Sequence, residues 1–214
     1  MNAGVQATIF IVDDDDSVRR AIANLLRAAG YATSTFASGR EFLDHPGDEP
    51  GCVILDLCMP DTNGLELQEQ LACRAYHPPI VFLSGQGNVS STASALKKGA
   101  VDFLEKPIND DVLLAAVADA LQRDQKKREQ MQQTADIAAR LAKLSAREFQ
   151  VLQHVIAGSL NKQIAYALGI SEKTIKVHRA RVMEKMEAHS VAKLVRLTEK
   201  MGVHPIDSAA TKVQ

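Results

Sequence analysis

The 214-residue sequence lacks the features that would direct it to a membrane or to an oxidising compartment. No apolar run approaches the ~18 residues that a helix needs to span a bilayer. The first six residues have neither the basic start nor the apolar middle of a signal peptide. Three cysteines, Cys52, Cys58 and Cys73, are odd in number and have no metal-ligand spacing. We therefore expect free thiols in the reducing cytoplasm and no membrane association.

Tryptophan is absent and aromatic residues make up only 4% of the chain, yet a hydrophobic content of 46% is enough for globular cores. The length favours one or two domains. The net charge of -1 hides an uneven distribution. Residues 1–123 carry 9 Lys and Arg against 17 Asp and Glu, whereas residues 124–214 carry 16 against 9. This asymmetry predicts two domains, one suited to a divalent cation and the other to a polyanion.

Residues 1–123 alternate between strand-like and helix-like segments. Short apolar runs predict five strands, at Thr8–Val12, Tyr31–Phe36, Cys52–Asp56, Pro79–Leu83 and Val101–Glu105. Amphipathic stretches that follow these runs predict helices, two of which end at Gly30 and Gly99. Five such units in succession predict a parallel sheet with right-handed crossovers and helices on both faces.

Polar side chains stand at the ends of four of these strands. They are Asp13 and Asp14 after the first, Asp56 at the end of the third, Ser84 after the fourth and Lys106 after the fifth. Ligands of such sheets bind beyond the carboxyl ends of the strands, so we expect these groups to meet. Clustered carboxylates suit Mg²⁺ (or Mn²⁺), and one carboxylate can act as a nucleophile toward phosphorus. Lysine and hydroxyl groups then balance the phosphoryl charge.

Each of these residues, taken singly, also has an ordinary structural explanation. An aspartate at a strand end can cap the next loop, and Ser84 can be a turn residue. The run Asp13 to Asp16 can be a solvated cluster at a helix start, which is the interpretation that we prefer for Asp15 and Asp16.

The region from about residue 7 to residue 123 resembles the receiver domain of two-component response regulators. The resemblance is carried by Ile11-Val12-Asp13-Asp14, Leu55-Asp56-Leu57-Cys58-Met59-Pro60-Asp61, Gly64, Leu83-Ser84-Gly85 and Phe103-Leu104-Glu105-Lys106-Pro107. It implies an α/β fold with a doubly wound five-stranded parallel sheet in the order 2-1-3-4-5. It also implies a cis peptide bond before Pro107.

The resemblance implies a nucleophile and a metal site. Asp56 is then the phosphoacceptor and also contacts the metal. Asp14 binds Mg²⁺ directly, Asp13 binds it largely through water, and the backbone carbonyl of Cys58 is a further ligand.

Three more residues acquire roles by the same resemblance. Lys106 pairs with phosphoryl oxygens, Ser84 moves onto the phosphate, and Phe103 is the aromatic that swings with it. Cys58 and Gln86 take positions whose side chains tune hydrolysis.

Residues 121–144 contain neither Gly nor Pro and are rich in Gln, Lys, Arg, Glu and Ala. Good helix formers with sparse apolar positions predict a helical connector that prolongs the last receiver helix. A disordered tether is the alternative.

Residues 145–202 carry start and stop signals for four helices. They are a capping box at Ser145–Glu148, a stop at Gly158, a start at Asn161, a turn at Gly169, a cap at Ser171 for a helix through Met186, and a last helix over Ser190–Met201. Two short helices joined through a glycine turn are typical of a helix-turn-helix motif.

The third of these helices is basic, with Ile175, Val182 and Met186 on a face that can be buried. The rest of its surface carries Lys173, Lys176, Arg179, Arg181 and Lys185. Lysine and arginine meet phosphates or guanines in a major groove, and small apolar side chains meet thymine methyl groups. An ordinary solvated face is the alternative.

This region resembles the LuxR-type (NarL/FixJ) DNA-binding domain. The matching residues are Leu144–Glu148, Gly158, Asn161–Ala165, Leu168–Ser171, Thr174–His178 and Lys185. The resemblance implies that Lys176, Val177 and Ala180 face bases. The implied phosphate contacts are Lys173, Thr174, His178, Arg179 and Arg181. For His178 a hydrogen bond within the domain is an equally good alternative.

Together these patterns predict a receiver domain at residues 1–123, a linker at 124–143, an all-α DNA-binding domain at 144–202 and a frayed tail at 203–214. The chain is identified as a member of the NarL/FixJ response regulators, which implies a cytoplasmic transcription regulator and not an enzyme. The implied partners are a sensor histidine kinase, double-stranded DNA, RNA polymerase and a second copy of the chain after phosphorylation.

Two alternatives belong to other classes. A Mg²⁺-dependent phosphatase or phosphotransferase often carries a second Asp two residues after its nucleophile, where this chain has Cys58, and no glycine-rich phosphate loop occurs. A protein-binding adaptor that works without phosphorylation would lack salt-dependent affinity for DNA.

Overall fold

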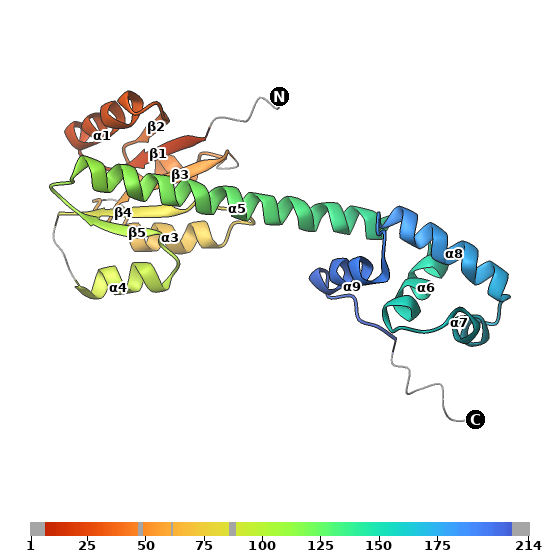
Figure 1. The fold of residues 1–214 in the computed structure, drawn as a ribbon. Helices are drawn as coiled ribbons and strands as arrows, with labels where there is room; N and C mark the ends of the chain where they lie inside the picture. Colours follow the sequence, from red (N-terminus) through yellow and green to blue (C-terminus); the bar gives the residue numbers. More distant parts are fainter. Residues whose placement is uncertain (1–6, 47–48, 61, 86–88, 207–214) are drawn as a thin grey trace. The chain divides into compact units, whose positions relative to one another are not determined.

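The structure, a computed structural model, describes residues 7–46, 49–60, 62–85 and 89–206 (Figure 1). Asp61, Gln86 and the end of the predicted tail lie outside the described residues. Internal contacts divide the chain into two units, residues 1–128 and 129–214. Among the described residues, no helix combines the length and the apolar character that crossing a bilayer requires.

The first unit contains a five-stranded parallel sheet in the order β2-β1-β3-β4-β5, which confirms the predicted fold. The strands are β1 (Thr8–Val12), β2 (Ala32–Phe36), β3 (Gly51–Asp56), β4 (Ile80–Ser84) and β5 (Asp102–Glu105). Every residue of β3 and of β4 is buried, as expected of strands covered on both faces.

Helices connect the strands and cover the sheet on both sides (Figure 1). They are α1 (Asp16–Ala28), α2 (Gly39–Leu43), α3 (Gly64–Ala72), α4 (Val89–Lys97) and α5 (Asp110–Ala142). Alternate side chains of β1 serve opposite layers: Ile9 and Ile11 pack with residues of α1 and α5, whereas Phe10 and Val12 pack with residues of α2, α3 and α4. The residue period of two along a strand is the cause of this division.

Helix α5 is 33 residues long and takes in the predicted linker, which is therefore helical. Its early residues Leu113 and Val117 are buried in the core of the first unit. Ile137, near its other end, is buried in the core of the second unit.

A buried carboxylate attaches α5 to the first unit. Asp124 is 2% exposed, and its Oδ2 accepts hydrogen bonds from the Gly51 amide at 2.9 Å and from Arg128 Nε at 3.1 Å. The Tyr76 hydroxyl donates to its Oδ1, and the Arg128 guanidinium lies over the Tyr76 ring, 4.1 Å from its centroid. Burial and the adjacent carboxylate raise the pKa of Tyr76. The start of β3 and the segment after α3 are thus joined to α5 through one side chain.

Asp124→Ala is expected to lower the free energy of unfolding of the first unit by about 2 kcal/mol, because three donors, from buried Gly51 and from the half-buried Tyr76 and Arg128, lose their acceptor. Urea unfolding of the full chain, followed by circular dichroism, measures the change. Asp119→Ala is the matched control, since that exposed residue pairs with Arg123, one turn along the same helix. The control should change stability by less than about 0.5 kcal/mol, and equal losses in the two variants would contradict the role of Asp124.

The second unit is helical, with a core formed by the end of α5 and by the helices that follow it. These are α6 (Ala146–Ile156), α7 (Asn161–Leu168), α8 (Glu172–Lys185) and α9 (Val191–Lys200). The capping box at Ser145 and Glu148 is present, and Gly169 ends α7 in a left-handed conformation with φ 64°. Ser171 caps α8 by accepting a hydrogen bond from the Thr174 amide. The sequence signals for the two helices on either side of this turn are therefore confirmed.

Candidate functional site

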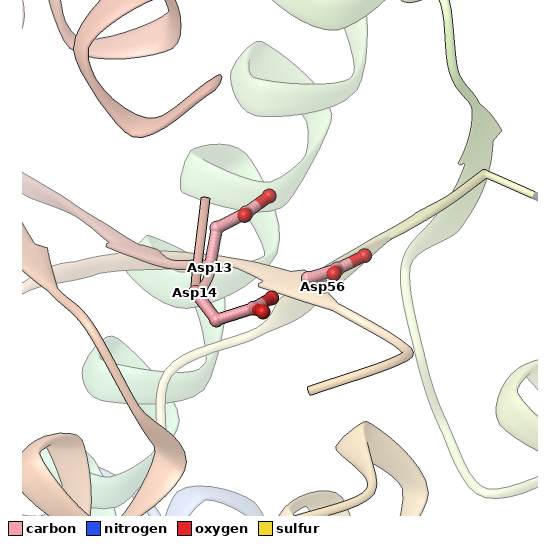
Figure 2. A group of neighbouring side chains, drawn as sticks. All are labelled: Asp13, Asp14 and Asp56. Atoms are coloured by element: carbon pink, nitrogen blue, oxygen red, sulfur yellow. The ribbon is translucent and has the colours of Figure 1, made fainter. Parts of the chain in front are cut away.

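Three carboxylates meet at the carboxyl ends of β1 and β3. Asp13 and Asp14 follow β1, and Asp56 is the last residue of β3. The two strands are neighbours in register, with Val12 paired to Leu55. One oxygen from each carboxylate can be chosen so that all three lie within 4.8 Å of one another (Figure 2). The structure thus brings together residues that lie more than 40 positions apart in the chain.

Asp13 is fully buried, and the chain contacts its polar groups on several sides. Its Oδ1 accepts a hydrogen bond from the Asp15 amide at 2.9 Å. Its backbone amide donates to the Phe36 carbonyl at 3.3 Å, and its own carbonyl accepts from Arg19 Nη1 at 2.6 Å. Asp15 in turn caps α1 and is not part of the cluster, as predicted.

Lys106 supplies the positive charge of the site. It follows β5, and its backbone amide donates to the Ser84 carbonyl at 2.8 Å. Its Nζ lies 2.8 Å from Asp13 Oδ2 and 3.2 Å from Asp56 Oδ1, so one ammonium bridges the two loops. The peptide bond between Lys106 and Pro107 is cis, as the resemblance implied.

Burial and neighbouring charges set the protonation of these groups. Burial raises the pKa of Asp56, and the nearby Asp13 adds to the rise, while Lys106 opposes it. Burial alone would lower the pKa of Lys106, but its hydrogen bond to Asp13 and the charges of Asp13 and Asp56 raise it. Lys106 is therefore held as a cation beside carboxylates that carry more negative charge than it can neutralise.

The donor set fits a hard divalent cation. All three candidate ligands are carboxylates, Asp13 and Asp56 are buried, and Asp14 is exposed. Mg²⁺ prefers oxygen ligands and keeps several waters, so a site with one side open to solvent suits it better than a closed cage. Thiols play no part in this cluster: Cys52 is buried in β3, and Cys58 and Cys73 are exposed free cysteines.

The loop after Asp56 is held close to the site by its own backbone. Cys58 forms an isolated bridge with Asn63, and the Gly64 amide donates to the Leu57 carbonyl at 3.0 Å. A Cβ on residue 64 would lie 2.6 Å from the Asp56 carbonyl oxygen, which leaves room only for glycine. The loop that carries the Cys58 carbonyl therefore turns back against Asp56.

The two predicted switch residues stand on the neighbouring strands. Asp56 is paired with Leu83, so Ser84 is one position beyond it on the adjacent strand β4, and it is fully buried. Phe103 on β5 is paired with Phe82 and only partly buried, with the two ring centroids 6.2 Å apart. Hydroxyl and ring thus occupy the strands that lead from Asp56 toward Lys106.

The second candidate site is the outer face of α8. Ile175, Val182 and Met186 are completely buried. The predicted base-facing residues Lys176, Val177 and Ala180 are exposed, as are the predicted phosphate contacts Lys173, Thr174 and Arg181. A helix that buries one side and presents lysine, arginine and small side chains on the other has the form of a major-groove reader.

Other basic residues of α8 are engaged within the unit. Lys185 Nζ lies 2.6 Å from Glu148 Oε2, and Lys185 together with the Ser145 amide holds the pKa of Glu148 at about 2. The sequence predicts Lys185 as one of the basic surface residues of this helix, but in the structure it forms an ion pair with α6. Arg179 Nη1 donates to Asn161 Oδ1 at 3.1 Å, and His178 Nδ1 is buried without a hydrogen-bond partner in the described chain.

The first unit has an acidic pocket with a bridging lysine at the edge of a 2-1-3-4-5 sheet, and the second unit has a helix-turn-helix. Together these features define a response regulator that binds DNA. Comparison with known proteins gives the same result. The response regulator receiver domain matches residues 9–118, and the domain described as "Bacterial regulatory proteins, luxR family" matches residues 142–198. The chain belongs to the two-component response regulators with a LuxR-type helix-turn-helix, a family of transcription regulators and not of enzymes.

Relatives match over nearly the full length. The chain is 41% identical to Nodulation protein W of Bradyrhizobium diazoefficiens, covering 99% of this chain and 93% of the relative. It is 42% identical to the transcriptional regulatory protein FixJ of Azorhizobium caulinodans, covering 94% and 96%. Among solved structures, the response regulator StyR aligns with a TM-score of 0.83 at 43% identity, covering 91% of this chain and 99% of StyR. The recognised family is therefore confirmed.

Sequence reasoning did not find Arg19, Asp124 or Tyr76. Arg19 lies on α1 among charged residues that look like an ordinary solvated face, and Asp124 falls in the polar stretch taken for linker.

Proposed function

We propose that Asp56 accepts a phosphoryl group from a sensor histidine kinase and that this event controls DNA binding by α8. The observation that carries the proposal is the Lys106 ammonium, which bridges Asp13 and Asp56 inside a cluster of three carboxylates. A receiver domain implies a histidine kinase partner, and a helix-turn-helix unit implies DNA.

An Asp56 carboxylate oxygen is the nucleophile in this proposal. It forms a new bond to phosphorus while the bond from phosphorus to the nitrogen of the kinase histidine breaks, and the electron pair leaves with that nitrogen. The Lys106 ammonium already lies 3.2 Å from Asp56, so it stands ready to pair with an oxygen of the incoming group.

Asp13, Asp14 and Asp56, with the Cys58 carbonyl, would hold Mg²⁺ (or Mn²⁺). A cation held there would supply positive charge against the charge that develops on the phosphoryl oxygens. Asp14 is exposed and suits direct contact, whereas Asp13 is buried and engaged by Asp15 and Lys106, which suits contact through water.

Ser84 and Phe103 would pass the signal on. A phosphoryl group on Asp56 attracts the Ser84 hydroxyl as a hydrogen-bond donor, and Phe103 would fill the space that this movement leaves. Such a change biases the surface of α4, β5 and α5 toward pairing with a second copy of the chain.

DNA would be bound by the exposed face of α8. Lys176, Val177 and Ala180 would meet bases, and Lys173, Thr174, His178, Arg179 and Arg181 would meet phosphates. In a homodimer two such helices occupy half-sites one or more helical turns apart. The receiver (residues 1–123) and the DNA-binding domain (144–202) would be coupled through residues 124–143, and the regulator would work in the cytoplasm with RNA polymerase as its further partner.

The proposal is tested by treating the full chain with acetyl phosphate and Mg²⁺. We expect a slower band on a phosphate-affinity gel, a dimer in sedimentation, and an affinity at least about fivefold higher for duplex DNA selected from a random pool. A phosphorylated chain with unchanged DNA affinity would contradict the control of α8, and a chain that takes up no phosphate would contradict the role of the carboxylate site.

A further inference from the structure

The guanidinium of Arg19 contacts the backbone of the acidic cluster at Asp13. Its side chain is only 14% exposed, whereas that of its neighbour Arg20 is 72% exposed. Nη1 donates to the Asp13 carbonyl at 2.6 Å, and Nη2 donates to Asp16 Oδ1 at 3.0 Å. One planar side chain therefore binds both ends of the four-residue acidic run.

This arrangement completes the set of contacts that hold Asp13 in place. The Asp13 amide, both carboxylate oxygens and the carbonyl each have a partner, from Phe36, Asp15, Lys106 and Arg19 respectively. Among the described contacts, the Arg19 bond is the one that joins the Asp13 carbonyl to a side chain of α1.

We propose that Arg19 is a positioning residue for the cation site: it fixes the backbone at Asp13, and thereby the direction of the Asp13 and Asp14 carboxylates, without touching the cation. This inference rests on the proposed function of the same site. Outer contacts of this kind commonly change metal affinity by 10-fold or more, because they determine where the ligands point.

Charge and geometry make opposite predictions for the removal of Arg19. If Arg19 acted only through its positive charge, its loss would leave the pocket more negative and Mg²⁺ would bind more tightly. If Arg19 positions the ligands, its loss weakens Mg²⁺ binding despite the more favourable charge. The sign of the change therefore separates the two explanations.

Arg20 provides the matched control. Its Nη2 lies 2.9 Å from Asp16 Oδ2, so it shares the Asp16 partner, but its side chain is 72% exposed, and the described contacts do not join it to Asp13. Arg19→Met and Arg20→Met each remove one positive charge, from adjacent residues, and each removes an ion pair with Asp16. Only the first removes the bond to the Asp13 carbonyl.

The experiment is a calorimetric titration of the full chain with MgCl₂, repeated with Mn²⁺ and followed by its electron paramagnetic resonance spectrum. We expect the Kd of Arg19→Met to rise about tenfold and that of Arg20→Met to stay within about twofold of wild type. Arg19→Lys keeps the charge but not the pair of donors, so its Kd should rise by at least about threefold, though less than that of Arg19→Met. With acetyl phosphate, the phosphorylation rate of Arg19→Met should recover at saturating Mg²⁺.

A Kd for Arg19→Met that is unchanged, or lower than that of wild type, overturns the inference. Thermal unfolding in EDTA shows whether each variant is folded. If Arg19→Met is unfolded, Arg19→Lys decides alone, and a Kd within twofold of wild type overturns the inference. If the wild-type chain itself does not bind Mg²⁺, the proposed cation site is refuted. If the wild-type chain binds Mg²⁺ and the loss of Arg19 has no effect, only the role of Arg19 is refuted.

Discussion

Asp56→Asn is expected to abolish phosphorylation of the chain by acetyl phosphate in the presence of Mg²⁺. The amide is close to the carboxylate in size but is not a nucleophile toward phosphorus, and it removes one of the three carboxylates of the cluster. A phosphate-affinity gel should show no slower band at times when the wild-type chain is largely modified. The increase in DNA affinity on treatment with acetyl phosphate should disappear with it.

Asp119→Asn is the control, since Asp119 is an exposed residue of α5 that pairs with Arg123. It should be modified at the wild-type rate. Continued phosphorylation of Asp56→Asn would show that another residue is the acceptor.

Asp56→Asn should also stabilise the metal-free chain. Burial raises the pKa of Asp56, so its folded state favours the protonated form, and the stability that Asp56 contributes is lost as pH rises from about 4 through this raised pKa. At neutral pH the charged Asp56 carboxylate therefore lowers the free energy of unfolding, and asparagine does not. In EDTA at pH 7 the Tm of Asp56→Asn should exceed that of wild type, and the difference should vanish at low pH, where Asp56 is protonated.

The double substitution Lys173→Ala and Arg181→Ala is expected to weaken binding to mixed-sequence duplex DNA by roughly tenfold. Both residues are exposed on α8 and are proposed to contact phosphates. Each phosphate contact contributes about -0.9 to the slope of log K against log salt, so the slope should become less negative by about 2. Fluorescence anisotropy over a series of salt concentrations measures both quantities.

Lys193→Ala with Arg196→Ala removes the same charge from exposed positions of α9 in the same unit. If α8 is the DNA-binding surface, this control should keep nearly the wild-type slope. Equal losses in the two double variants would mean that net charge, and not the surface of α8, is responsible for binding.

The positions of the strands and of the carboxylates at their ends follow from local patterns. Continuous apolar runs such as Cys52–Asp56 are typical of strands buried on both faces, and the structure confirms β3 at Gly51–Asp56. Capping residues are equally local, which is why Ser145 and Ser171 predicted the starts of α6 and α8. Given a parallel sheet with the strand order 2-1-3-4-5, which the resemblance implied, Asp13, Asp14, Asp56 and Lys106 are expected to meet at one edge.

Contacts between distant segments do not follow from such patterns. The Lys185 ion pair with Glu148 joins residues 37 positions apart, and the bond from Gly51 to Asp124 spans 73. Lys185 reads as one more solvated basic residue, and Asp124 as part of a polar linker, until the helices that bring their partners near are in place. Arg19 differs from Arg20 only in the direction in which α1 presents it.

The amino-acid sequence by itself determined the two kinds of domain, the family and the acidic residues of the site, because periodicity, caps and strand-end residues act over a few positions. Tertiary structure alone decided which charges are paired and buried. Those pairings depend on the packing of helices against the sheet and against one another, and packing places side chains within 3 Å that no local rule connects.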